Sequence, residues 1–147
     1  MSFYLDTNVL VSLFLKDTNS RRVESWLESK TDGRFVVSQW TRAEFSAVAL
    51  RGARSGNYSA DHAAILIANF GAWQQKLAGI VELSPAAGTL CVQLAAVHGL
   101  KLSAPDALHL ALATIAQVTL VTLDVRLAEA ARARNHSVVG PEVFMVE

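Results

Sequence analysis

The sequence has little that would build a secreted protein. Its 147 residues include one cysteine, Cys91, so no internal disulfide can form, and a reducing compartment fits the chain. We expect Cys91 to be a small buried hydrophobic residue rather than a nucleophile. The apolar run at residues 9–15 has no basic stretch before it, so no secretion signal is visible. We therefore expect a cytoplasmic protein.

Long hydrophobic runs and a charge of one sign are also missing. The longest apolar region, residues 107–123, is interrupted by His109 and further polar residues, whereas a membrane span needs about 20 largely apolar residues. We therefore expect no membrane association. The 13 basic residues balance 13 acidic ones, and this balance neither supports nor excludes a phosphate-bearing partner.

Apolar residues are abundant instead. They make up 52% of the chain. This fraction predicts a large core and is enough for an additional apolar surface that a partner covers. The chain shows no internal repeat, low-complexity tract or linker. We therefore expect a single domain over residues 1–147.

Short apolar strands alternate with helical stretches along the chain. We predict strands at residues 3–5, 35–37, 80–83, 119–122 and 138–139. We predict helices at residues 8–15, 20–29, 40–54, 59–77 (capped by Ser59 or Asp61), 85–98, 105–116 and 124–134. This alternation predicts an α/β fold with a parallel sheet between two layers of helices. Such sheets bind ligands at the carboxyl ends of their strands.

Two carboxylates lie where predicted strands end. Asp6 comes directly after the first strand and Asp124 two residues after the fourth, so both belong to the edge where a parallel sheet binds ligands. Each is also placed to cap the following helix, and capping alone explains Asp124 well. Thr7 and Asn8 are positioned to orient Asp6 by hydrogen bonding.

A third acid, Glu44, shares one face of its predicted helix with Trp40 and Val48. A carboxylate on such an apolar face needs a partner, because burying an unpaired charge is too costly. That partner is either a metal ion or an arginine. The arginine candidates are Arg42, Arg51 and Arg54.

Asp106 lies in the first turn of the helix predicted at residues 105–116, where the helix dipole favours an acid. The rest of that helix is apolar nearly all round, so we expect the helix to be buried and Asp106 to be buried with it. His109 is three residues further on and close enough to hydrogen-bond Asp106. We interpret His109 as a satisfied core histidine rather than a metal ligand.

The four acids together indicate metal-dependent chemistry on phosphates. Carboxylates without cysteine or paired histidine select Mg2+ or Mn2+ over zinc. Such a site activates water and stabilises an in-line displacement at a phosphodiester. A phosphatase with an aspartyl nucleophile usually has a second aspartate two residues later, where this chain has Asn8. A non-catalytic interaction module is the other alternative, and the apolar surplus fits it.

Four segments resemble, in this order, the motifs of PIN-domain nucleases: LDTNVL (residues 5–10), RAEF (42–45), PDALH (105–109) and VTLD (121–124). The resemblance covers essentially the whole chain, whose size makes it similar to VapC-type toxins of bacterial toxin–antitoxin pairs. It implies a three-layer α/β/α sandwich with a mostly parallel sheet. It also implies an RNA endonuclease that leaves a 5′-phosphate, forms a homodimer and is inhibited by a cognate antitoxin.

The same resemblance implies which residues form the site. The matching motif positions make Asp6, Glu44, Asp106 and Asp124 the acids that hold Mg2+ or Mn2+, and Thr7 and Thr122 their polar companions. Several basic residues are candidate phosphate contacts, although a solvated surface role also explains each of them. They are Arg21, Arg22, Arg42, Arg51, Arg54, Lys101 and Arg126.

Overall fold

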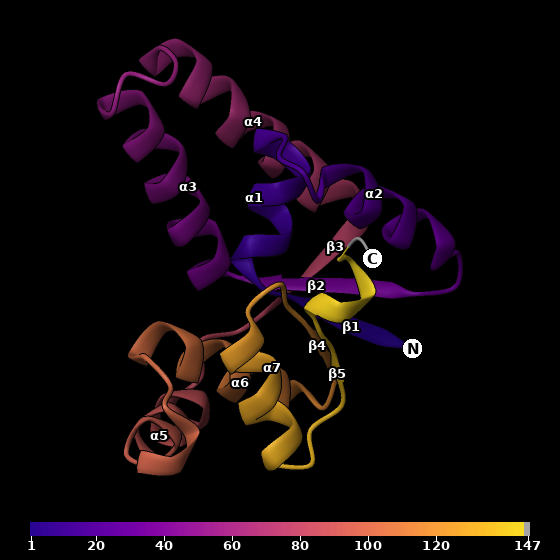
Figure 1. Ribbon diagram of the computed structural model, residues 1–147, viewed down its shortest axis with the longest axis vertical. Coiled ribbons are helices and arrows are strands. Elements are labelled where there is room, and N and C mark those ends of the chain that lie inside the picture. Colours follow the sequence, from indigo (N-terminus) through magenta and orange to yellow (C-terminus); the bar gives the residue numbers. More distant parts are fainter. Residues whose placement is uncertain (146–147) are drawn as a thin grey trace.

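Five short parallel strands form one sheet at the centre of the molecule (Figure 1). The computed structural model describes residues 1–145. Across the sheet the strands follow the order β3 (Ala78–Val81), β2 (Arg34–Ser38), β1 (Ser2–Leu5), β4 (Thr119–Val121) and β5 (Val138–Val139). The parallel sheet predicted from the alternating elements is confirmed.

Helices cover both faces of this sheet (Figure 1). One layer contains α1 (Thr7–Leu15), α2 (Ser20–Ser29), α3 (Gln39–Arg54) and α4 (Ala60–Leu77). The other contains α5 (Pro85–Ala95), α6 (Ala104–Ala116) and α7 (Val125–Ala133), and short 3-10 turns lie at η1 (His98–Leu100) and η2 (Pro141–Val143). The expected three-layer α/β/α arrangement is confirmed. Among the helices of residues 1–145, none combines the length and apolar character that a membrane crossing requires.

Successive residues of the strands point to opposite faces of the sheet and pack into two separate hydrophobic cores. Tyr4 and Leu120 point to the face that α5, α6 and α7 cover, and both are fully buried there. Leu5 and Val121 point to the opposite face and pack with residues of α1, α3 and α4. Because side chains alternate along a strand, each short strand anchors both layers of helices.

The chain changes direction across the sheet next to β1. It adds β2 and β3 on one side of β1, then returns to add β4 and β5 on the other. The carboxyl ends of β1 and β4 meet at this switch point, where the backbone N–H of Asp6 donates to the carbonyl oxygen of Val121 at 2.9 Å. Open parallel sheets bind their ligands at such a place.

Both predicted ends of one strand, the predicted end of one helix and one predicted burial are wrong. β3 covers Ala78–Val81 rather than residues 80–83, so it begins directly after α4 and residues 82 and 83 lie beyond it. The helix predicted to reach residue 98 ends at Ala95 and is followed by the separate 3-10 turn η1. Cys91 is only partly buried, because α5 is an outer helix whose next residue, Val92, is 71% exposed. Of the two expected caps of α4, Ser59 accepts the capping bond from His62 N.

Candidate active site

A cavity of about 360 Å³ opens at the switch point of the sheet. The structure brings three of the predicted acids to its wall, namely Asp6, Glu44 and Asp106. Asp124 is absent from that wall in the described part of the chain, although its charge acts on Asp106. A further acid, Asp17, lines the cavity and was not singled out in the sequence.

Asp6 is 4% exposed and occupies the N-cap position of α1. Its side chain accepts no capping hydrogen bond from residues 1–145, so capping is the wrong explanation for this acid. Instead Oδ2 accepts a bond of 2.7 Å from Thr122 Oγ1, and Oδ1 lies 3.3 Å from Nε2 of His109. Burial raises the pKa of Asp6, although the charge of His109 and the Thr122 bond oppose this shift.

Thr122 orients Asp6 and is itself held in place. Asn8 Nδ2 donates to Thr122 Oγ1 at 3.3 Å, and the backbone N–H of Asp124 donates to the same oxygen at 3.0 Å. Asn8 also accepts a bond of 3.1 Å from the backbone N–H of Leu123. Asn8 therefore supports Asp6 through Thr122 rather than by the direct bond that we expected.

Glu44 is partly buried on α3, and its hydrogen-bond partners are the Thr7 hydroxyl and the His109 imidazole. Thr7 Oγ1 donates to Glu44 Oε1 at 2.7 Å, and Nε2 of His109 lies 2.5 Å from the same oxygen. Within residues 1–145, no arginine forms an ion pair with Glu44, so the arginine alternative is wrong. Burial alone would raise the pKa of Glu44, but the bond and charge of His109 and the Thr7 bond together lower it.

His109 connects these groups and is 1% exposed. Its Nδ1 lies 2.8 Å from the hydroxyl oxygen of Tyr4, while Nε2 faces Glu44 and Asp6. The expectation of a buried, satisfied histidine is confirmed, but its hydrogen bonds go to Tyr4 and Glu44 rather than to Asp106. Burial lowers the pKa of His109, yet the surrounding carboxylates, Asp6 first, outweigh burial and raise it.

Asp106 and Asp124 have different surroundings. Asp106 lies in the first turn of α6, which Ser103 caps by accepting a 3.4 Å bond from the Asp106 backbone N–H. Burial raises the pKa of Asp106, the Ser103 bond opposes this, and the negative charges of Asp6 and Asp124 raise it further. Asp124 caps α7, because its Oδ1 accepts a 3.0 Å bond from the backbone N–H of Leu127. The capping explanation therefore holds for Asp124.

Sequence reasoning missed Asp17 and did not connect His109 with Glu44 or Asp6. Asp17 Oδ1 accepts bonds from Ser12 Oγ at 2.6 Å and from the Asn19 backbone N–H at 2.8 Å, so it also stabilises the turn between α1 and α2. The spacing between Asp106 and His109, one helical turn, was noticed, but it predicted a bond to Asp106 rather than the contacts with Tyr4 and Glu44.

The donor atoms at this site fit a divalent cation. Asp6, Glu44 and His109 each offer one ligand atom, and these three atoms lie within 4.8 Å of one another. Carboxylate oxygens suit Mg2+ and Mn2+, whereas the His109 nitrogen shares a hydrogen with Glu44 Oε1 in this structure and would join them as a ligand only after losing it. A cation would also relieve the crowding of negative charge that raises the pKa of Asp106. The donor set fits a metal without selecting one.

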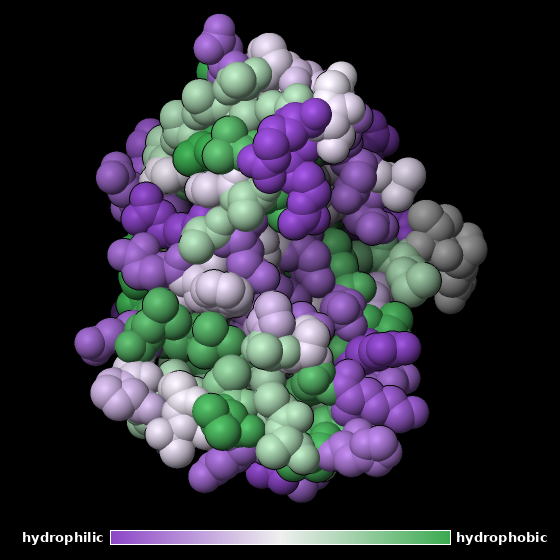
Figure 2. Space-filling view, turned by 90° about the vertical axis from the view of Figure 1, so that its left-hand side faces the viewer, coloured by the Kyte–Doolittle hydropathy of each residue, from purple (hydrophilic) through white to green (hydrophobic). Residues whose placement is uncertain are grey.

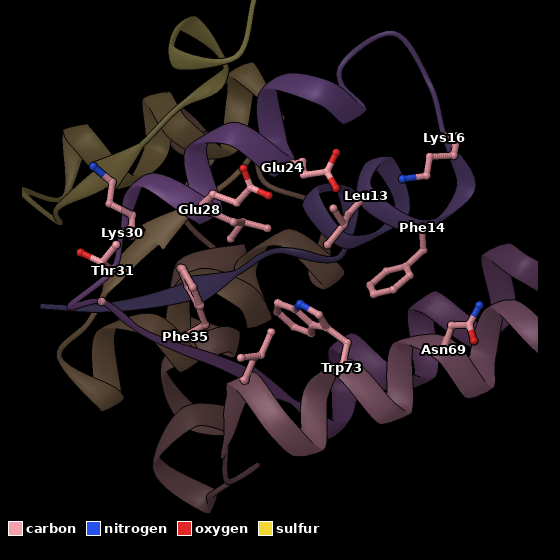
Figure 3. Close-up of a pocket in the computed structure, with 13 residues that line it drawn as sticks. Leu13, Phe14, Lys16, Glu24, Glu28, Lys30, Thr31, Phe35, Asn69 and Trp73 are labelled. Atoms are coloured by element: carbon pink, nitrogen blue, oxygen red, sulfur yellow. The ribbon is translucent and has the colours of Figure 1, made fainter.

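A larger cavity, of about 660 Å³, lies elsewhere, between α1, α2 and α4. Figure 3 shows Phe14, Phe35 and Trp73 around it, with Glu24 and Glu28 of α2 along one side. Among the residues described, the group of potential metal ligands lies outside this larger cavity. Two of these potential ligands, Asp6 and Glu44, line the smaller, acidic cavity, which is therefore the candidate site.

Comparison with known proteins relates this fold and site to one family. A family model described as PIN domain matches residues 3–133. Comparison with curated proteins gave no match.

Several solved structures share the fold. The chain is similar to FitAcB from Neisseria gonorrhoeae, with a TM-score of 0.73 and 23% identity over 95% of this chain and 98% of that one. It is similar to a toxin–antitoxin complex from Klebsiella pneumoniae, with a TM-score of 0.62 and 23% identity over 94% and 96% of the two chains. It is also similar to VapC20 from Mycobacterium tuberculosis, described as a sarcin–ricin loop cleaving toxin, with a TM-score of 0.66 and 14% identity over 87% and 94%.

Proposed function

The chain belongs to the PIN domain family, and from this premise we propose that it is a metal-dependent endoribonuclease and the toxin of a toxin–antitoxin pair. The observation that carries the proposal is the convergence of Asp6, Glu44 and Asp106 on one cavity at the switch point of the sheet. Asp6 lies between β1 and α1, Glu44 on α3 and Asp106 on α6, so no single local capping role accounts for their meeting.

The acids have distinct proposed roles. Asp6 and Asp106 hold the cation most directly, Glu44 holds it or orients the attacking water, and Asp124 completes the cluster while capping α7. When bound, Mg2+ or Mn2+ supplies Lewis acidity toward the water and the phosphodiester. Thr122 fixes one oxygen of Asp6 and Thr7 fixes one oxygen of Glu44 by the hydrogen bonds described above.

The proposed substrate is RNA and the proposed inhibitor is a cognate antitoxin. The sarcin–ricin loop cleaving toxin supports the first proposal, and the Klebsiella toxin–antitoxin complex supports the second. Among the candidate phosphate contacts we favour Arg42 and Arg126, because both are exposed and each lies two residues from a site acid, Glu44 or Asp124. Arg22 is less available, since it donates to the backbone oxygen of Phe144.

We also propose a homodimer. Figure 2 shows hydrophobic residues gathered on the side of the molecule that α3, α4 and α5 occupy. Exposed apolar side chains of these helices include Leu50, Ile65 and Val92. A second copy of the chain that covered this side would remove them from water, which supports association.

The test is cleavage of defined RNAs by purified protein with Mg2+ or Mn2+, then with EDTA, then with the metal restored. We expect cleavage with either metal, none with EDTA and recovery on restoration, with 5′-phosphate ends on the products. Cleavage that persists unchanged in EDTA would contradict the metal-dependent mechanism.

A metal titration separates this function from a non-catalytic interaction module of the same fold. A cation that binds only the folded protein at a hundred times its Kd stabilises it by about 2.7 kcal/mol. We expect the melting temperature to rise on adding Mn2+ or Mg2+. An interaction module without a metal site should show no such rise.

A further inference from the structure

We propose that His109 is a positioning residue that holds Glu44 and Asp6 in their working arrangement, and that Tyr4 fixes the orientation of the His109 ring. The inference rests on the proposed function, because it assigns a role toward acids that we propose to hold a metal. It adds a histidine and a tyrosine to a site that was predicted from carboxylates and threonines.

The first support is the place of the imidazole between the acids. Nε2 of His109 lies 2.5 Å from Glu44 Oε1, 3.3 Å from Asp6 Oδ1 and 3.3 Å from Thr7 Oγ1. These neighbours belong to α3, to the end of β1 and to α1, while His109 lies on α6 one turn after Asp106. One ring nitrogen of α6 therefore contacts side chains from three other places in the fold.

The second support is the direction of the hydrogen bonds. An ionised carboxylate only accepts, so Nε2 must carry the hydrogen that it shares with Glu44. A nitrogen that donates in this way has no lone pair for a metal, so His109 supports the acids instead of joining them as a ligand. Nδ1 faces the Tyr4 hydroxyl at 2.8 Å, and this contact prevents the ring from turning over.

The third support is a set of hydrogen-bonded hydroxyl groups that joins His109 to the first turn of α3. The Tyr4 hydroxyl lies 2.9 Å from Ser38 Oγ and 3.3 Å from Thr41 Oγ1, and these two residues form the reciprocal capping box of α3. Glu44 is on the same helix, one turn after Thr41. The network thus connects the start of α3 to His109 through Tyr4 of β1. His109 in turn contacts Glu44, which lies on the same helix.

The network is buried and well satisfied. Tyr4, Ser38 and Thr41 are fully buried and His109 is 1% exposed. Polar networks of this kind hold one arrangement, because any other arrangement leaves a buried group without a partner. Partners that orient metal-binding side chains typically affect metal affinity or activity by roughly 10- to 100-fold when they are removed.

Three variants test the proposal, with a matched histidine as control. His109→Leu removes every polar atom of the ring, whereas His109→Gln keeps a donor near the position of Nε2. Tyr4→Phe removes only the hydroxyl behind the ring. The control is His98→Leu, because His98 is exposed in η1. Circular dichroism and thermal unfolding without metal check that each variant folds.

The measurements are the Kd for Mn2+ by isothermal titration calorimetry, and kcat and KM for a cleaved RNA. We expect His109→Leu to bind Mn2+ roughly 10- to 100-fold more weakly and to lose kcat with little change in KM. We expect His109→Gln to restore most of the affinity, Tyr4→Phe to fall between, and His98→Leu to match the wild type. A role in folding alone would lower the melting temperature and leave the Kd and kcat of the folded protein unchanged.

The contrary outcomes are distinct. An unchanged Kd and kcat in His109→Leu overturn the inference, and if that variant does not fold, an unchanged Kd and kcat in Tyr4→Phe do so. Equal losses in His109→Leu and His109→Gln, with nitrogen coupling in the Mn2+ electron paramagnetic resonance spectrum of the wild type, make His109 a ligand and also overturn it. Failure of the wild type to bind Mn2+ or Mg2+ contradicts the proposed function itself.

Discussion

Asp6 and Glu44 face the same imidazole, yet their pKa values shift in opposite directions. Asp6 is almost fully buried, so the cost of burying its charge dominates and raises its pKa. Glu44 is more exposed and accepts bonds from both His109 and Thr7, which lower its pKa. In the metal-free protein the interactions with His109 and Thr7 therefore outweigh burial at Glu44, whereas burial outweighs the interactions with His109 and Thr122 at Asp6.

The raised pKa of His109 predicts how stability depends on pH when EDTA removes metal ions. The folded protein holds the His109 proton more tightly than the unfolded chain does. The resulting stability is fully present below the unfolded histidine pKa of about 6.5 and is lost as the pH rises through the higher folded value. We expect the free energy of unfolding, measured with urea, to fall over that interval.

His109→Gln supplies the control for this experiment, because glutamine keeps a donor but does not titrate. Its free energy of unfolding should change less over the same interval than that of the wild type. A wild-type stability that rises there, or an identical profile in His109→Gln, would contradict the assignment.

At the scale of helices and strands, Asp124 combines a capping role with its proposed place in the cluster. Asp124→Ala removes the acceptor for the Leu127 backbone N–H and should destabilise the protein by about 1 kcal/mol. Asp124→Asn keeps a good cap and should cost much less. Urea unfolding of both variants measures this difference.

The same two variants test the charge of Asp124. If Asp124 completes the acid cluster, both variants should weaken Mn2+ binding, although only the alanine loses the cap. Wild-type Mn2+ affinity in Asp124→Asn would leave Asp124 with its capping role alone.

The sequence predicted the elements well where their local pattern is strong. The switch from short apolar strands to helices recurs along the chain, so the parallel sheet with helices on both faces followed from it. β3 was misplaced because Ala78 and Gly79 lack the branched side chains that usually mark a strand. α5 was extended to a His–Gly pair that instead lies in a separate 3-10 turn.

The partners within the candidate site were harder to predict, because they are distant along the chain. Asp6 and Glu44 were noticed because each sits in an unusual local setting. The contact of His109 with Tyr4 joins residues 105 positions apart, and its contact with Glu44 joins residues 65 positions apart. In the sequence, a histidine on an apolar helix has the pattern of a core residue. The two carboxylates near it come from distant segments, and only the folded chain places them beside it.

At the scale of the whole molecule, the proposed homodimer depends on the apolar side formed by α3, α4 and α5. Val92 of α5 is the most exposed of the large apolar residues given for these three helices, at 71%. Val92→Asp should weaken association and shift the mass measured by light scattering toward that of a monomer, because a buried unpaired charge is costly. Val143→Asp, in η2 outside these helices, is the matched control. A wild-type protein that is monomeric at all concentrations would contradict the dimer.

The account's most direct test is RNA cleavage by Asp6→Asn and Asp106→Asn, prepared free of host nucleases. Both substitutions keep the size of the side chain and remove its charge at the cavity that Asp6 and Asp106 line. Removing one electrostatic group from an active site commonly costs about a hundredfold or more in rate. Asp32→Asn, an exposed aspartate in the turn before β2, is the control.

We predict that Asp6→Asn and Asp106→Asn lose cleavage on this scale while their circular dichroism spectra match the wild type. We also predict that Asp32→Asn cleaves at the wild-type rate. Undiminished cleavage by both cavity variants would contradict the claim that these carboxylates form the active site.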